Sequence, residues 1–104
     1  MTKLVIIRGA AGSGKSTYAE KFVADGYVRV ESDDFFTDRN GIYKWDQSRM
    51  TEVFRKQLVK VTRYLFSGQD VVVPGCFTKL SDMKDYINFC HEYGIEYEIY
   101  EMKT

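Results

Sequence analysis

The chain has 104 residues, of which 44% are hydrophobic and 29% are charged, a composition typical of one small globular domain and not of a disordered or membrane-embedded protein. Its 15 basic and 15 acidic residues cancel, so the chain as a whole has no net charge that would attract nucleic acid or a membrane surface. No apolar run could span a bilayer or act as an export signal, and Cys76 and Cys90 lack metal-ligand spacing, so we expect a cytoplasmic protein with reduced thiols.

The first predicted strand, residues 3–8, carries aliphatic side chains without polar alternation, which predicts burial on both faces of a parallel sheet. The pattern G-x-x-x-x-G-K-[ST] follows, and its glycines let successive N–H groups point at one phosphate. Lys15 is spaced to reach the β- and γ-phosphates and the Ser16 hydroxyl to bind Mg²⁺. The sequence therefore predicts a nucleoside triphosphate site built by this phosphate loop: Gly9, Ala10, Ala11, Gly12, Ser13, Gly14, Lys15, Ser16 and Thr17.

A helix is predicted from Lys15 to Asp25, with Gly26 as its left-handed cap and a short strand at residues 27–30 after it. The run Glu31-Ser32-Asp33-Asp34-Phe35-Phe36 follows that strand directly and contains two adjacent carboxylates, Asp33 and Asp34. Because the carboxyl ends of parallel strands open onto one crevice, both acids are expected near the phosphate loop. A solvated helix cap is the alternative, and the phosphate loop favours the functional interpretation. The buried face of the first helix is predicted to contain Ala19, Phe22 and Val23.

Residues 37–45 are predicted to form a polar, flap-like loop with a turn at Asn40-Gly41. Its Tyr43 and Trp45 either stack on a base or cover the core. A long helix follows, beginning at the N-cap Asp46 and reaching Phe66. Its buried stripe is predicted to contain Met50, Val53, Phe54, Val61 and Leu65.

The outer face of this long helix carries the main concentration of positive charge in the chain. Its basic residues are Arg49, Arg55, Lys56, Lys60 and Arg63, against Glu52 alone. Two interpretations remain open for this face. It is either a solvated surface, the commoner case, or a track for the backbone of a polyanion.

The third predicted strand, residues 70–74, is again a continuous β-branched run that suits a central position. Many phosphate-loop enzymes carry an Asp at the end of such a strand to hold Mg²⁺ through water, and here Pro74 stands at that point. A helix at residues 81–93 and an alternating strand at 95–101, suited to a sheet edge, complete the chain. Strands that alternate with helices predict an α/β fold with a parallel sheet covered on both faces.

The segment from Leu4 to Thr17, the run Ser32-Asp33-Asp34-Phe35-Phe36, the triplet Gly41-Ile42-Tyr43 and the long helix together resemble the polynucleotide kinase-like branch of phosphate-loop NTPases. Short phage-type members of this branch are often described as ATP-binding or AAA-type proteins. The resemblance implies one three-layer domain over residues 1–104 with strand order 2-3-1-4. It also implies ATP and Mg²⁺ as cofactors, with Lys15 and Asp33 as catalytic residues, Asp33 accepting the proton of a polynucleotide 5′-hydroxyl. Ser16 and Asp34 would serve the metal.

Two departures from the family pattern keep the function open. Pro74-Gly75-Cys76 replaces polar residues usual after the third strand, and the arginine-bearing lid would lie beyond Thr104, so we expect a truncated core without a lid. The sequence leaves three functions: a kinase for a single-stranded nucleic acid 5′-end, a small-metabolite kinase, and a non-catalytic nucleotide-binding subunit. A second copy or a partner chain that completes the site also remains open, and no membrane partner is expected.

Overall fold

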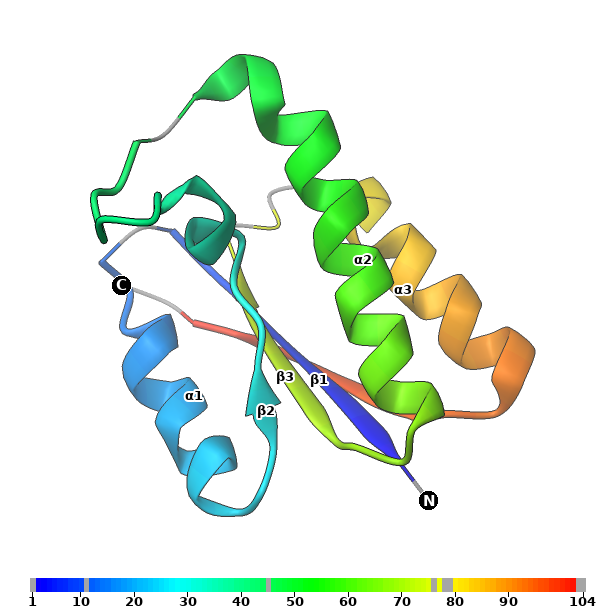
Figure 1. The fold of residues 1–104 in the computed structure, drawn as a ribbon. Helices are drawn as coiled ribbons and strands as arrows, with labels where there is room; N and C mark the ends of the chain where they lie inside the picture. Colours follow the sequence, from blue (N-terminus) through cyan, green and yellow to red (C-terminus); the bar gives the residue numbers. More distant parts are fainter. Residues whose placement is uncertain (1, 11, 45, 76, 78–79, 103–104) are drawn as a thin grey trace.

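The computed structural model describes residues 2–10, 12–44, 46–75, 77 and 80–102 (Figure 1). Its helices and strands follow the alternating order expected from the sequence. They are β1 (Lys3–Arg8), α1 (Lys15–Ala24), β2 (Val28–Arg29), α2 (Met50–Phe66), β3 (Val71–Gly75), α3 (Leu80–Tyr93) and β4 (Glu96–Glu101). Two short 3₁₀ helices, η1 (Ser32–Phe36) and η2 (Gln47–Arg49), lie between β2 and α2.

The sheet has the order β2-β3-β1-β4, and all its pairings are parallel. β1 pairs with β3 on one side, with Leu4 opposite Val71, and with β4 on the other. The strand order 2-3-1-4 is thereby confirmed, and so is the position of β4 at an edge of the described sheet. β1 and β3 are central because their continuous aliphatic runs can be buried on both faces.

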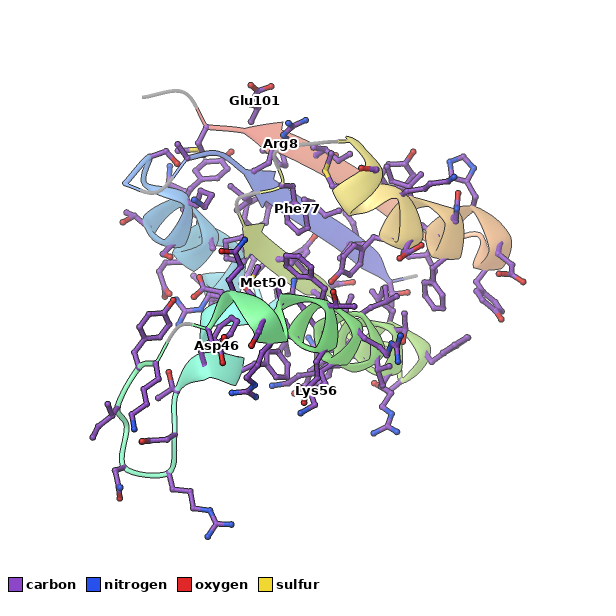
Figure 2. All side chains as sticks on the ribbon, turned by 90° about the horizontal axis from the view of Figure 1, so that it is seen from above. Arg8, Asp46, Met50, Lys56, Phe77 and Glu101 are labelled. Atoms are coloured by element: carbon purple, nitrogen blue, oxygen red, sulfur yellow. The ribbon has the colours of Figure 1, made fainter. Side chains whose placement is uncertain are left out.

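The sheet is the middle of three layers, with α1 on one face and α2 and α3 on the other (Figures 1 and 2). Successive residues of β1 serve the two faces in turn. Leu4 and Ile6 join the core under α2 and α3, whereas Val5 and Ile7 join the core under α1. All four of these side chains are 0% exposed. Burial of each stabilises the fold by roughly 1.5–3 kcal/mol, which anchors the strand that carries the phosphate loop.

Two predictions about the helix faces are wrong, and one buried residue was not predicted. Val23 is 38% exposed and Phe54 is 45% exposed, whereas Gln57 is buried. On α2, the residues facing the sheet recur at steps of four, which places Gln57 between Val53 and Val61 and turns the neighbouring Phe54 away. Val23 lies beside Phe22 at the margin of a narrow face whose centre is the fully buried Ala19.

The entry into α2 is more gradual than expected. Asp46 Oδ1 accepts a hydrogen bond from the backbone N–H of Ser48 at 3.0 Å, so Asp46 caps η2, and α2 begins after it at Met50. β2 is also shorter than predicted, although the N–H of Val30 still donates to the Val72 carbonyl at 3.0 Å. Within the described part of the chain, no helix has the length and apolar character needed to cross a membrane.

Candidate functional site

The phosphate loop joins the carboxyl end of β1 to the N-terminus of α1. Gly14 is the N-cap of α1 and has a left-handed backbone with φ 90°. Gly9 is required for a different reason, because a Cβ atom there would lie 2.8 Å from Ser13 Oγ and 3.0 Å from the carbonyl oxygen of Met102. The loop is therefore packed against the residue that follows β4. Ala11, also predicted to contact phosphate, lies outside the described residues.

The Lys15 side chain is folded back over its own loop. Its Nζ donates to the carbonyl oxygens of Gly9 at 2.8 Å and Ala10 at 2.9 Å. Ser13 Oγ is buried close by and has no hydrogen-bond partner among the described residues. The N-terminus of α1 carries orphan backbone N–H groups and the positive end of the helix dipole, so together with Lys15 it presents an arrangement that suits an anion.

The loop residue Ser16 contacts an acid that sequence reasoning passed over. Ser16 Oγ donates a hydrogen bond of 3.0 Å to Glu31 Oε1, and the Glu31 side chain is only 16% exposed. Arg29 Nε lies 3.9 Å from the same carboxylate oxygen. The sequence did show an acid, Glu31, just after the strand that precedes Asp33. Its contact with Ser16, however, joins the end of β2 to the start of α1. Residue spacing within one element cannot predict such a contact.

Hard oxygen ligands are what Mg²⁺ prefers, and a hydroxyl beside a carboxylate at an anion site fits that ion. Most of the remaining ligands of a phosphate-bound Mg²⁺ are phosphate oxygens and waters. The described residues contain no group of three or more His, Cys, Asp or Glu side chains that could hold a metal alone. The site thus suits a cation that arrives with a nucleotide.

Asp33 and Asp34 lie on η1, which begins just beyond β2 with Glu31 as its N-cap. Figure 1 shows η1 at the end of the sheet where the phosphate loop also lies. The backbone therefore places both acids at the loop end of the sheet, while the placement of their side chains is outside the described part. Their chemical roles stay predictions.

Residues 37–44 form a projecting hairpin between η1 and α2 (Figure 2). Thr37 pairs with Tyr43, and Asp38 Oδ1 accepts from the N–H groups of Asn40 at 2.8 Å and Ile42 at 2.9 Å. The predicted turn is present at its tip. Tyr43 is 51% exposed and meets Phe36 edge-on, whereas Trp45 lies outside the described residues.

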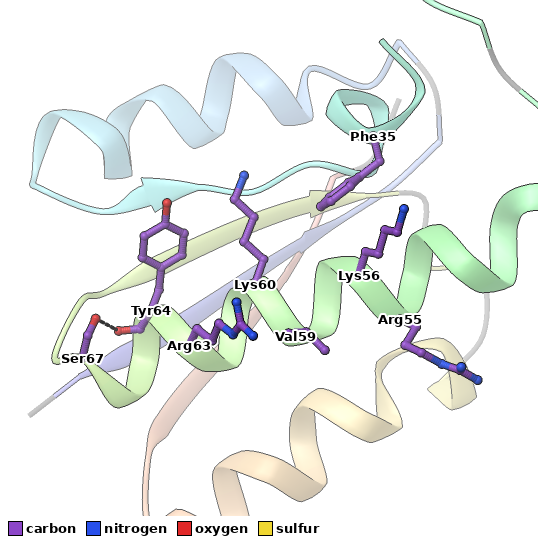
Figure 3. A pocket seen from close by; sticks show the side chains of 8 residues that line it. All are labelled: Phe35, Arg55, Lys56, Val59, Lys60, Arg63, Tyr64 and Ser67. Atoms are coloured by element: carbon purple, nitrogen blue, oxygen red, sulfur yellow. Dashed lines mark hydrogen bonds between the residues drawn. The ribbon is translucent and has the colours of Figure 1, made fainter. Parts of the chain in front are cut away.

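A pocket of about 700 Å³, here called the basic pocket, lies between η1 and the outer face of α2 (Figure 3). It is lined by Phe35, Arg55, Lys56, Val59, Lys60, Arg63, Tyr64 and Ser67. Most of the predicted basic face of α2 is thus gathered here.

The charges of the basic pocket are only partly neutralised. Lys56 pairs with Glu52 at 2.8 Å, and Lys60 Nζ stands 5.6 Å from the centre of the Phe35 ring. Arg55, Lys60 and Arg63 have no ion-pair partner within the described ranges. Arg49, predicted with this face, instead lies over Phe36 and near Glu52. The pocket combines positive charge with aromatic and aliphatic surface, which suits an anion that carries a ring.

The carboxyl end of β3, where an acid is missing, is apolar. Pro74 is buried and stands opposite Ile7, and Phe77 beyond it is 7% exposed. Cys76 lies outside the described residues. The other cysteine, Cys90, is 1% exposed in the core, and burial raises its pKa to about 11.

A family model described as "AAA domain" matches residues 4–104. An uncharacterised protein of Pasteurella multocida (strain Pm70) is 26% identical over the whole of this chain, which spans 66% of that protein. A chain of the Pnkp1/Rnl/Hen1 complex is 27% identical with a TM-score of 0.82, over 99% of this chain and 36% of that one.

The APS kinase of Mycobacterium tuberculosis, solved in complex with AMPPNP and APS, is similar in fold alone. It is 20% identical with a TM-score of 0.73, over 98% of this chain and 62% of that one.

Proposed function

Because the chain belongs to the AAA domain family and is a polynucleotide kinase-like phosphate-loop NTPase, we propose that it binds ATP with Mg²⁺ and transfers the γ-phosphate to a hydroxyl acceptor. The acceptor we propose is the 5′-hydroxyl of a single-stranded polynucleotide. The observation that carries the proposal is the phosphate loop itself, with Lys15 and Ser16 at the N-terminus of α1.

ATP would occupy the anion site of this loop. Lys15 would exchange the carbonyl oxygens of Gly9 and Ala10 for phosphate oxygens, and the first N–H groups of α1 would hold the β-phosphate. The AMPPNP complex of the similarly folded APS kinase supports ATP as the nucleotide. Ser16 would bind the metal, with Asp34 assisting. When bound, Mg²⁺ neutralises charge that develops on the phosphates.

Asp33 is the proposed general base. Its carboxylate takes the proton of the acceptor hydroxyl as that oxygen forms a bond to the γ-phosphorus and the bond from phosphorus to the β–γ bridging oxygen breaks. The products are a phosphate ester and ADP. Support comes from the position of η1 next to β2 and at the loop end of the sheet.

A polynucleotide acceptor is supported by the basic pocket. The net charge of the chain is zero, so binding of a polyanion needs a local patch, and Arg55, Lys60 and Arg63 supply one. Phe35, two residues after Asp33, lines the same pocket and offers a ring on which a base can stack. A single-stranded polynucleotide bound in the basic pocket would thus extend toward η1, which carries Asp33.

The test is transfer of labelled γ-phosphate from ATP to a single-stranded oligonucleotide with a 5′-hydroxyl. The same oligonucleotide with a 5′-phosphate is the acceptor control, and Lys15→Ala is the enzyme control. Label on the first oligonucleotide alone, lost in Lys15→Ala and in Asp33→Asn, is the expected result. Label that survives in Asp33→Asn would remove Asp33 from its role.

A non-catalytic nucleotide-binding subunit is the second candidate, favoured by Pro74 in place of a strand-end acid. It predicts ATP binding without label on any acceptor. A small-metabolite kinase would instead label a small hydroxyl compound, and its acceptor affinity would be insensitive to salt, unlike that of a polyanion.

A further inference from the structure

Glu31 stands level with the position at which the sheet lacks its acid. β2 and β3 run parallel, with Val28 opposite Val71 and Arg29 opposite Val72. Two residues further along the same register, Glu31 comes level with Pro74. The carboxylate is therefore displaced by one strand from the usual strand-end position, while it stays at the loop end of the sheet.

The contacts of Glu31 direct it at the phosphate loop. Oε1 accepts the 3.0 Å hydrogen bond from Ser16 Oγ, and the side chain is 16% exposed. The nearby Arg29 is shared, because it also pairs with Glu20. A shielded carboxylate beside a site for several phosphate charges repels the nucleotide unless a cation lies between them.

We propose that Glu31 is the acid that positions hydrated Mg²⁺ against Ser16, in the place of the acid missing at Pro74. Its carboxylate accepts hydrogen bonds from water on the metal while Ser16 contacts the metal. This inference rests on the proposed function only in requiring that the loop binds a metal–nucleotide complex, and it does not require phosphoryl transfer.

The competing explanation is structural, with Glu31 merely tying α1 to the end of β2 through Ser16. Glu31→Gln separates the two, because the amide oxygen can still accept from Ser16 whereas the negative charge is gone. Glu20→Gln is the matched control. It removes the other carboxylate that contacts Arg29 but leaves the Ser16 contact untouched.

The experiment titrates Mg²⁺ and, separately, Mn²⁺ into the full chain with AMPPNP, with nucleotide affinity measured by calorimetry and bound Mn²⁺ by electron paramagnetic resonance. Glu31→Gln should raise the metal concentration needed for half-maximal metal binding in the presence of AMPPNP by about 10- to 100-fold. Its affinity for metal-free AMPPNP should be unchanged or higher. Glu20→Gln should stay within about twofold of the wild type, since it does not touch the metal's surroundings.

Unchanged metal dependence in Glu31→Gln would overturn the inference, and so would an equal loss of affinity with and without metal, which is the structural outcome. The inference would also be overturned if the AMPPNP affinity of the wild-type chain did not depend on the Mg²⁺ concentration. If Glu31→Gln does not fold, Glu31→Asp decides, since a shortened acid must weaken metal binding without weakening metal-free binding. Transfer of labelled phosphate is measured in a separate assay. Metal binding through Glu31 without any transfer would contradict the kinase proposal and leave the inference about Glu31 intact.

Discussion

The phosphate loop and the basic pocket are built in different ways. The loop is made by backbone, with Gly9 packed against Met102, Gly14 in a left-handed turn and Lys15 held by main-chain carbonyls. The pocket is made by side chains on one face of α2 and by Phe35, with three cations that lack ion-pair partners in the described structure. A backbone site fails as a unit, whereas a side-chain site loses affinity one charge at a time.

The largest effect should come from Lys15→Ala. Removing the amine takes away the charge that faces the phosphates, so label transfer should fall by about 10²-fold or more. Steady-state transfer rates check this, and thermal unfolding should show a folded variant. Lys21→Ala, one turn and a half further along α1, is the control and should transfer normally. A Lys15→Ala chain with near-normal rates would contradict a site centred on this loop.

Gly9→Ala tests whether the loop behaves as a backbone unit. The new Cβ would lie 2.8 Å from Ser13 Oγ and 3.0 Å from the Met102 carbonyl oxygen, so the loop must shift. Overpacking of this kind costs typically about 1–3 kcal/mol, and we expect ATP affinity to fall about tenfold or more. Calorimetry measures the affinity. The control, Gly94→Ala after α3, should lower stability without changing ATP affinity, because it is remote from the loop.

The pocket should respond in a graded manner. Lys60→Ala with Arg63→Ala removes two cations. The negative slope of log affinity for single-stranded oligonucleotide against log salt should become shallower by about 0.7 per cation. Fluorescence anisotropy over a salt series gives the slope, and ATP affinity should not change. Lys84→Ala, an exposed cation on α3, is the control. An unaltered slope in the double variant would mean that polyanions bind elsewhere.

The smallest effect on the two sites is expected from the core beneath α3, which lies away from both of them. Burial raises the pKa of Cys90 from about 9 to about 11, so the folded state holds the proton more tightly than the unfolded state does. Stability from this group is complete below pH 9 and is lost as the pH rises toward 11, by at most about 2–3 kcal/mol. Urea unfolding from pH 7 to 10.5 checks this. Cys90→Ala should flatten that part of the profile, and an unchanged slope would contradict the shift.

Local signals were sufficient for most of the fold. Aliphatic runs marked β1 and β3, and Gly26, Gly68 and Gly94 stand just past the ends of α1, α2 and α3, as left-handed caps do. The strand order, by contrast, came from family resemblance, because residue spacing alone does not say which buried strands are neighbours. The predicted buried stripe of α2 was right at Val53, Val61 and Leu65. It included Phe54, which is exposed, and left out the polar Gln57, which is buried.

The site was only half predictable for a related reason. The residues of the loop follow from its motif, since the motif encodes a backbone shape. The contact between Ser16 and Glu31 depends on how β2 docks beside β3, and the basic pocket depends on how η1 lies against α2. Neither docking is written in the local sequence.

The contact between the phosphate loop and Met102 has a consequence for folding. The motif is contiguous in the chain, yet Gly9 of the motif packs against Met102, which is distant in the sequence. The Met102 N–H also donates to the Arg8 carbonyl at 2.8 Å. The two contacting residues are separated by nearly the whole length of the chain. Contacts of such large sequence separation have a high entropic cost and form slowly. A peptide that contains β1, the motif and α1 but not β4 would keep the motif and lack the packing of Met102 on Gly9. Nucleotide affinity is therefore expected only once the whole sheet has formed.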